Sequence, residues 1–248
     1  MDAGSFPKQN GTFPPPRLPC ASRQETALTM KIFLLMSISC LMAPLVIGEE
    51  QEGFVEDSLL FLTDSRSEHV VLSLRKEMSL SDLTLCLRFN TELRTKHSLF
   101  SYNTRDLLLA REDDRTMRVS IGGKELRFRL PADLWGWVHV CVARDASAGL
   151  VALYINGEPT VRKQLQSAPT ITMSGSVILG HEQDKIGQES SYVGEMVDVN
   201  LYDRVLSPRT IRRLARGESE AQGNVISWLT ASIQTKGNVV IQRSTRVQ

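Results

Sequence analysis

Short apolar runs separated by polar turns fill the chain from residue 58 to residue 203, a pattern typical of proteins built from many β-strands. In residues 84–90, Leu85, Leu87 and Phe89 alternate with Thr84, Cys86 and Arg88, which indicates a strand with one buried face. We expect further strands at residues 58–63, 69–74, 97–102, 107–110, 135–145, 174–180 and 195–203.

Two hairpins are signalled by turns that tolerate positive φ. Gly122-Gly123 separates the run MRVSI from KELRFRLP, and Asn156-Gly157 lies within residues 149–163. Both dipeptides suit a tight two-residue turn between antiparallel strands. The sequence therefore predicts a hairpin at each position.

One helix is predicted late in the chain. Ser207 is a suitable N-cap, Pro208 suits the first helical position, and Gly217 is a stop signal. Its arginines face away from the apolar side, where they form either an anionic docking patch or an ordinary solvated surface. Residues 224–229 and 238–242 are predicted as closing strands.

Many antiparallel strands with a single late helix favour an all-β fold, a two-sheet antiparallel jelly-roll sandwich with one short helix. One domain of about 200 residues fits that class. The whole chain carries a net charge of +1 and has an ordinary globular composition. Neither feature favours nucleic acid or an anionic membrane as partner.

The amino-terminal region has the features of a secretory leader. Residues 30–48, MKIFLLMSISCLMAPLVIG, carry a lysine, an apolar run and a final small residue, as signal peptides do. The apolar run is too short for a transmembrane anchor. Residues 1–29 are rich in Pro, Gly and Ser, which indicates a disordered extension or a misassigned start. We therefore expect a secreted domain at residues 49–248.

Cysteine usage fits secretion. Loss of residues 1–48 would leave Cys86 and Cys141 as the only cysteines. In an oxidising compartment a single disulfide between them is the simplest prediction, with two buried free thiols as the other possibility.

Oxygen-bearing side chains gather just after the strand predicted at residues 174–180. They are Glu182, Gln183, Asp184, Gln188 and Glu189. Calcium binds six to eight oxygens, so this cluster is a candidate cation site, and a solvated acidic loop is the simpler reading.

Catalytic signatures are weak. His181-Glu182 begins like the zinc motif HExxH, but position 185 is a lysine, and no GxSxG elbow is present. A sandwich-fold glycosidase would need a second acid close to Asp184, where Lys185, Ile186 and Gly187 stand instead. We expect a binding protein and not an enzyme.

Sequence pieces spread over residues 54–242 resemble the pentraxins. They are LTLCLRFNTEL, SLFSY, IGGKEL, WVHVCV, INGEPTVRK, VILGHEQD and VGEMVDVNLYDRVLSP. The resemblance implies a lectin-like jelly roll, a Cys86–Cys141 disulfide and a ring of five subunits. It also implies calcium-dependent binding of phosphocholine, phosphoethanolamine or related ligands on cell or microbial surfaces, in extracellular innate recognition. In the family hallmark His-x-Cys-x-Ser/Thr-Trp, Arg144 replaces the tryptophan.

The resemblance also assigns site residues. Glu182, the backbone carbonyl of Gln183, and Asp184 match calcium positions of the family. The Asp-Asn pair of the first calcium is replaced by the shortened loop NTRD, where Asp106 is the first stand-in and Asn103 the second. The second calcium would use Glu189 from another shortened loop.

Two further positions match those that bind phosphocholine in the family. Glu125 corresponds to the acid that faces the quaternary ammonium, and Ala110 to the apolar residue under the choline methyl groups. Because alanine offers little apolar area, we expect weaker choline binding or a different ligand. The shortened loops and Ala110 also suggest a second hypothesis, a calcium-independent interaction protein on the same jelly roll.

Overall fold

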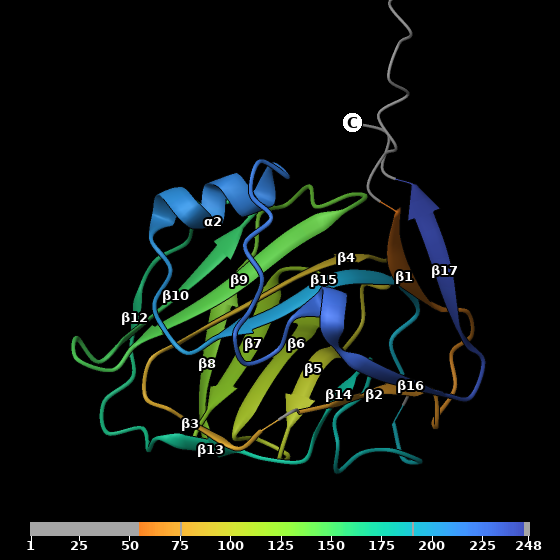
Figure 1. Ribbon diagram of the computed structural model, residues 1–248, viewed down its shortest axis with the longest axis horizontal. Helices are drawn as coiled ribbons and strands as arrows, with labels where there is room; N and C mark the ends of the chain where they lie inside the picture. The colour runs from red at the N-terminus through yellow and green to blue at the C-terminus, as the bar shows by residue number, and fades with distance from the viewer. Residues whose placement is uncertain (1–54, 75, 190, 246–248) are drawn as a thin grey trace, which may run out of the picture. The chain divides into compact units, whose positions relative to one another are not determined.

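The computed structural model describes residues 55–74, 76–189 and 191–245, most of which are antiparallel strands (Figure 1). The strands are β1 (Val55–Phe61), β2 (His69–Ser73), β3 (Met78–Leu80), β4 (Leu83–Asn90), β5 (His97–Tyr102), β6 (Leu107–Asp113), β7 (Thr116–Ile121), β8 (Lys124–Arg129), β9 (Val138–Asp145), β10 (Leu150–Ile155), β11 (Glu158–Pro159), β12 (Lys163–Gln164), β13 (Ile171–Met173), β14 (Ser176–Leu179), β15 (Gly194–Tyr202), β16 (Ser232–Lys236) and β17 (Val239–Thr245). The helical elements are α2 (Pro208–Ala215) and a 3-10 turn (Trp228–Thr230).

Two large sheets pack against each other. The first follows the order β11-β10-β9-β4-β15-β1-β17, with β12 also paired to β10, and the second follows β16-β2-β14-β5-β6-β7-β8. Alternate residues of both sheets point into one buried core, including Phe89 and Val142 from the first sheet and Leu109 and Val119 from the second. The predicted antiparallel jelly-roll sandwich is confirmed.

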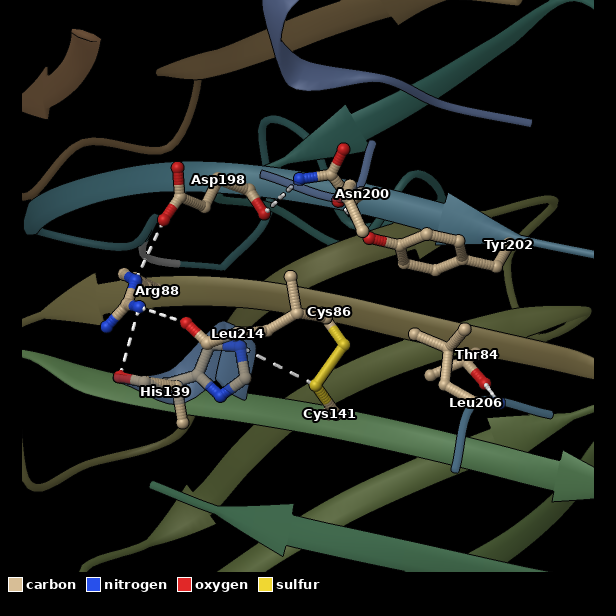
Figure 2. The surroundings of a disulfide bond; sticks show 12 residues. Thr84, Cys86, Arg88, His139, Cys141, Asp198, Asn200, Tyr202, Leu206 and Leu214 are labelled. Carbon is tan, nitrogen blue, oxygen red and sulfur yellow. Dashed lines mark hydrogen bonds and ion pairs between the residues drawn. A yellow bond between two sulfur atoms is a disulfide. The ribbon is translucent and has the colours of Figure 1, made fainter. Parts of the chain in front are cut away.

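The disulfide lies on the opposite face of the first sheet, between the sheet and α2 (Figure 2). Cys86 in β4 and Cys141 in β9 are directly opposite in the ladder, with Cα atoms 4.1 Å apart and their sulfur atoms bonded. The predicted pairing is therefore confirmed. Tyr154, Tyr202 and Ile211 belong to the same buried cluster.

The helix α2 begins and ends as its sequence predicts. The Ser207 hydroxyl accepts a hydrogen bond from the Thr210 amide, and Gly217 adopts a φ of 71° just after the helix. Arg88 of β4 donates to the last carbonyls of the helix, at 2.5 Å to Leu214 and 3.1 Å to Ala215 (Figure 2). This arginine fastens the carboxyl end of α2 to the first sheet.

Both predicted hairpins form. Gly122 and Gly123 have φ values of 55° and 77° between β7 and β8, and Asn156 and Gly157 have 50° and 84° between β10 and β11. The return strand after Asn156-Gly157 is shorter than expected and comprises only Glu158–Pro159, beyond which the Thr160 amide still donates to the Leu153 carbonyl at 2.8 Å.

Two strand predictions need correction. Residues 135–137 precede β9 in a loop, because Gly136 takes a φ of 65° that interrupts an extended chain. Residues 224–229 form only one bridge, Ile226 to Leu201, before the 3-10 turn. There the side-chain oxygen of Asn200 accepts from the amides of Gly223 and Trp228, so a side chain replaces the expected ladder.

Predictions for residues 1–48, the extension and the signal peptide, lie outside the described residues. Within the described ranges, no helix has the length and apolar character needed to cross a bilayer.

Candidate functional site

The acidic segment of residues 181–189 begins at a glycine that packs tightly against the core. Gly180 follows β14 with a φ of 80°, and a Cβ at this position would collide with the ring of Phe61. Its carbonyl accepts a hydrogen bond from the Tyr192 amide at 2.8 Å. The chain therefore turns sharply at Gly180 and enters the acidic segment from a fixed direction.

Hydrogen bonds hold the start of the segment on the outer face of the second sheet. The Gln183 amide donates to the Ser101 hydroxyl at 3.1 Å, and the Gln183 side-chain oxygen accepts from the Asn103 amide at 2.9 Å. The buried His181 ring lies between two backbone carbonyls, at 3.1 Å from Glu182 and 3.0 Å from Glu189. The His181 ring thus links the two ends of the segment, residues 182 and 189, through hydrogen bonds within the protein.

A guanidinium group lies at the centre of this site. Arg118 in β7 alternates with the core residues Met117 and Val119, so its side chain points to the outer face. It donates to the carboxylate of Glu182 in a buried ion pair whose side chains are 8% and 7% exposed. A carboxylate this buried requires a paired cation, and Arg118 supplies it.

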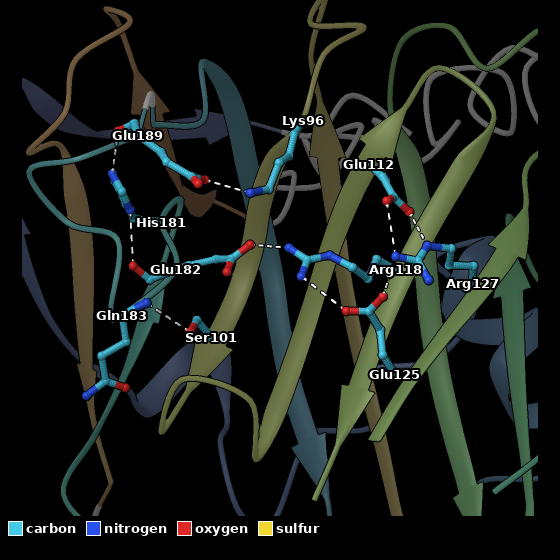
Figure 3. A network of polar contacts seen from close by, with 10 residues as sticks. All are labelled: Lys96, Ser101, Glu112, Arg118, Glu125, Arg127, His181, Glu182, Gln183 and Glu189. Carbon is cyan, nitrogen blue, oxygen red and sulfur yellow. Dashed lines mark hydrogen bonds and ion pairs between the residues drawn. The ribbon is translucent and has the colours of Figure 1, made fainter. Parts of the chain in front are cut away.

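The ion pair continues as a chain of alternating charges carried by β6, β7 and β8 (Figure 3). Arg118 also lies 3.5 Å from a carboxylate oxygen of Glu125, and Glu125 lies 2.6 Å from the guanidinium of Arg127. Arg127 pairs in turn with Glu112 at 2.6 Å. The predicted calcium residue Glu182 and the predicted ammonium-facing residue Glu125 are therefore brought to the same guanidinium.

Two of the remaining predicted metal residues, Glu189 and Asp106, interact with other side chains. Glu189 pairs with Lys96 at 2.7 Å, and this hydrogen bond lowers the pKa of the Glu189 carboxyl. A carboxylate oxygen of Asp106 accepts from the side chain of Asn103 at 3.3 Å. The Asp184 side chain is exposed to solvent.

The predicted calcium carboxylates do not converge on one point in this arrangement. Calcium needs six to eight oxygens around one point. Within the described ranges, only Cys86, His139 and Cys141 bring three or more histidine, cysteine, aspartate or glutamate ligand atoms within 4.8 Å of one another. That group contains the disulfide. The four carboxylates of the predicted site do not form such a cluster, and Glu182 already neutralises the charge of Arg118.

Ala110 lies beneath this network without an exposed surface. It is directly opposite Arg118 in the β6–β7 ladder and is fully buried, whereas Glu125 is partly exposed. Because the alanine side chain is small, it leaves space above the outer face of β6 at this position.

Sequence reasoning missed Arg118. Its signal was the period-two alternation of TMRVSI, which places Met117, Val119 and Ile121 in the core and sends Arg118 and Ser120 outward. The sequence could not show that Arg118 contacts Glu182, a residue 64 positions further along the chain.

Comparisons with known proteins agree with the fold and the sequence pieces. A family model described as the Pentaxin family matches residues 57–243. Serum amyloid P-component of Cavia porcellus is 33% identical over 191 residues, which cover 74% of this chain and 85% of that protein. C-reactive protein of Mus musculus is 32% identical over 201 residues, covering 77% and 89%.

A solved structure shares the fold. The heptameric SAP-like pentraxin from Limulus polyphemus superposes with a TM-score of 0.65 at 24% identity, covering 76% of this chain and 95% of that one. The family match spans nearly all of the two-sheet domain described above. The chain belongs to the pentraxin family.

Proposed function

We propose that the chain is a secreted, oligomeric recognition protein that binds ligands on cell or microbial surfaces without using calcium at residues 182–189. Membership of the pentraxin family supports a lectin-like pattern-recognition role and binding in place of catalysis. The observation that carries calcium independence is the position of Arg118 between Glu182 and Glu125. With this arginine in place, the acidic segment has its cation and needs no metal to hold it on the sheet.

The second candidate is calcium-dependent binding of phosphocholine or phosphoethanolamine. It is favoured by the segment Gly180–Asp184, which keeps the Glu-Gln-Asp order directly after β14 in a chain of this family. This function would require Glu182 to leave Arg118 and several carboxylates to converge on one ion.

Retention on a phosphocholine or phosphoethanolamine resin separates the two candidates. For the calcium-independent function we expect the same retention, high or low, in calcium and in EDTA. Retention that appears in calcium and is reversed by EDTA would establish the second candidate in its place. Capture on whole bacterial or apoptotic cells in EDTA tests surface recognition itself, and no capture on either would overturn it.

Secretion and oligomerisation are part of the proposal. Signal peptide features at residues 30–48 and the Cys86–Cys141 disulfide support an extracellular protein. The family resemblance favours a homopentamer, although a protein of the same fold is described as heptameric. Mass spectrometry of the secreted amino terminus and of the native assembly measures both properties, and retention of residues 1–29 would contradict the leader.

A further inference from the structure

We propose that Arg118 is a resident cation that closes the binding site: it neutralises Glu182 where a metal would otherwise be needed, and it occupies the approach to Glu125. This inference deepens the proposed calcium-independent function and rests on it. It further implies that replacing this single residue opens a site for a divalent cation on the outer face of the second sheet.

The path of the arginine across the sheet supports this role. Arg118 is opposite Ala110, and Ala110 is opposite Ser98, so three strands in register carry an arginine, an alanine and a serine. Neighbouring strands are about 4.8 Å apart, so the guanidinium must cross β6 to approach the segment that follows β14. Small residues on β6 and β5 provide the room, and an aromatic side chain at position 110 would block it.

Charge supports the same role. Arg118 and Glu182 are both more than nine-tenths buried, and Glu125 gives the guanidinium a second carboxylate at 3.5 Å. A planar guanidinium has five N–H donors, so it can bridge two carboxylates, and its permanent positive charge offsets theirs, which a neutral side chain cannot do. Without Arg118, the buried Glu182 carboxylate would lose its cation, with the partly exposed Glu125 close by, and this position would attract another cation.

A hydroxyl group that makes no hydrogen bond to any described residue lies beside Glu182. It belongs to Ser98, which is 4% exposed. Ser98 and Glu182 line the same small pocket, together with Lys96, Lys185 and Glu189, whose carboxylate is already paired with Lys96. When the arginine is absent, this hydroxyl and the Glu182 carboxylate are oxygen ligands of the kind that calcium prefers.

The test compares wild type, Arg118→Ser and Arg127→Ser as intact secreted proteins. Arg127 is the matched control, because it is opposite Arg118 in the β7–β8 ladder and also pairs with Glu125, but has no contact with Glu182. Calcium chloride alone is titrated by calorimetry, and thermal unfolding is measured in calcium and in EDTA.

We expect calcium to bind Arg118→Ser at least about tenfold more tightly than wild type or Arg127→Ser, and to raise the unfolding midpoint of Arg118→Ser alone. The proposal is overturned if calcium stabilises wild type as much as Arg118→Ser, or if Arg118→Ser gains nothing from calcium. Capture of cells by wild type in EDTA is scored separately, so a failure of surface recognition is distinguishable from a failure of the resident cation.

Two measurements keep the proposal testable if Arg118→Ser does not fold. Arg118→Lys retains the positive charge, and we expect it to bind no more calcium than wild type; a gain of calcium binding would overturn the proposal. In wild type, amide hydrogen exchange of residues 181–189 should be the same in calcium and in EDTA. Slower exchange in calcium would show that a metal, and not Arg118, holds the segment.

Discussion

The guanidinium of Arg118 and the carboxylate of Glu182 form a buried ion pair that joins the second sheet to the segment after β14. The two residues are 64 positions apart in sequence, so the pair fixes a long-range contact. Glu182 corresponds to a calcium residue of the family by resemblance, and here its charge is neutralised by a side chain. This contact gives the acidic segment a cation that is always present.

A double-mutant cycle measures the strength of that pair. Removing one partner leaves an unpaired buried charge, so Arg118→Met or Glu182→Gln should each lower the free energy of unfolding by about 3–5 kcal/mol. The double variant Arg118→Met/Glu182→Gln should lose clearly less than the sum of the single losses. Urea unfolding of the three variants and wild type checks this, and additive losses would argue against a direct pair.

Acid should destabilise the protein through His97. This side chain is 3% exposed, and burial lowers its pKa from 6.5 to about 4, against a hydrogen bond to the Thr95 carbonyl that raises the pKa. Because the unfolded chain binds the proton more readily, stability is full above pH 6.5 and is lost as the pH falls from about 6.5 to 4. Linkage gives a loss of about 2 kcal/mol at pH 5 relative to pH 7.

The variant His97→Gln isolates that effect. It should flatten the pH dependence of the free energy of unfolding between pH 7 and 5. His69→Gln is the control, because His69 is less buried and its pKa is also lowered chiefly by burial. An unchanged slope in His97→Gln would show that other groups cause the acid sensitivity.

Two glycines of the site region make a matched pair. Gly180 and Gly187 have nearly the same φ, 80° and 84°, but a Cβ at Gly180 would strike Phe61, whereas a Cβ at Gly187 meets no atom within 4 Å. Gly187→Ala should cost about 1 kcal/mol through backbone strain alone. Gly180→Ala should cost roughly 1–3 kcal/mol more, because the core must also shift. Equal losses in thermal unfolding would refute the close approach to Phe61.

The disulfide should stabilise the protein mainly by restricting the conformations of the unfolded chain. Cys86 and Cys141 enclose a separation of 55 residues, for which the chain-entropy estimate is about 4 kcal/mol. Replacing both with alanine should lower the free energy of unfolding by up to this amount in non-reducing urea titrations. Wild type with added reductant should move toward the double variant, and no shift in either would contradict the estimate.

Period-two patterns and turn chemistry predicted most of the sandwich, because they are local properties. The alternation in residues 84–90 and the turns Gly122-Gly123 and Asn156-Gly157 each correspond to what the structure contains. Residues 224–229 were assigned wrongly, because their apolar pattern cannot show that Asn200 would hold the loop amides in place of a neighbouring strand. The short strand β16 was missed, because its sequence SIQTK has only one apolar residue and so shows no clear alternation of apolar and polar positions.

The candidate site was less predictable than the fold, because it depends on contacts between distant strands. Sequence resemblance pointed to Glu182 and Glu125, and both belong to one charge network. No local pattern could show that Arg118 lies between them, since this requires the register of β5, β6 and β7 and the small residues Ser98 and Ala110. The calcium assignment of the five acidic and amide residues remains a prediction that the arrangement does not favour.

Thermal unfolding of the intact wild-type protein in calcium and in EDTA tests the central claim most directly. With Arg118 as the resident cation, we predict the same unfolding midpoint in both solutions. If calcium binds the folded protein, a free calcium concentration about 100 times the dissociation constant would add about 2.7 kcal/mol to the free energy of unfolding. The unfolding midpoint would then rise by roughly 5–10 °C. A rise of that size in calcium, reversed by EDTA, would contradict the account.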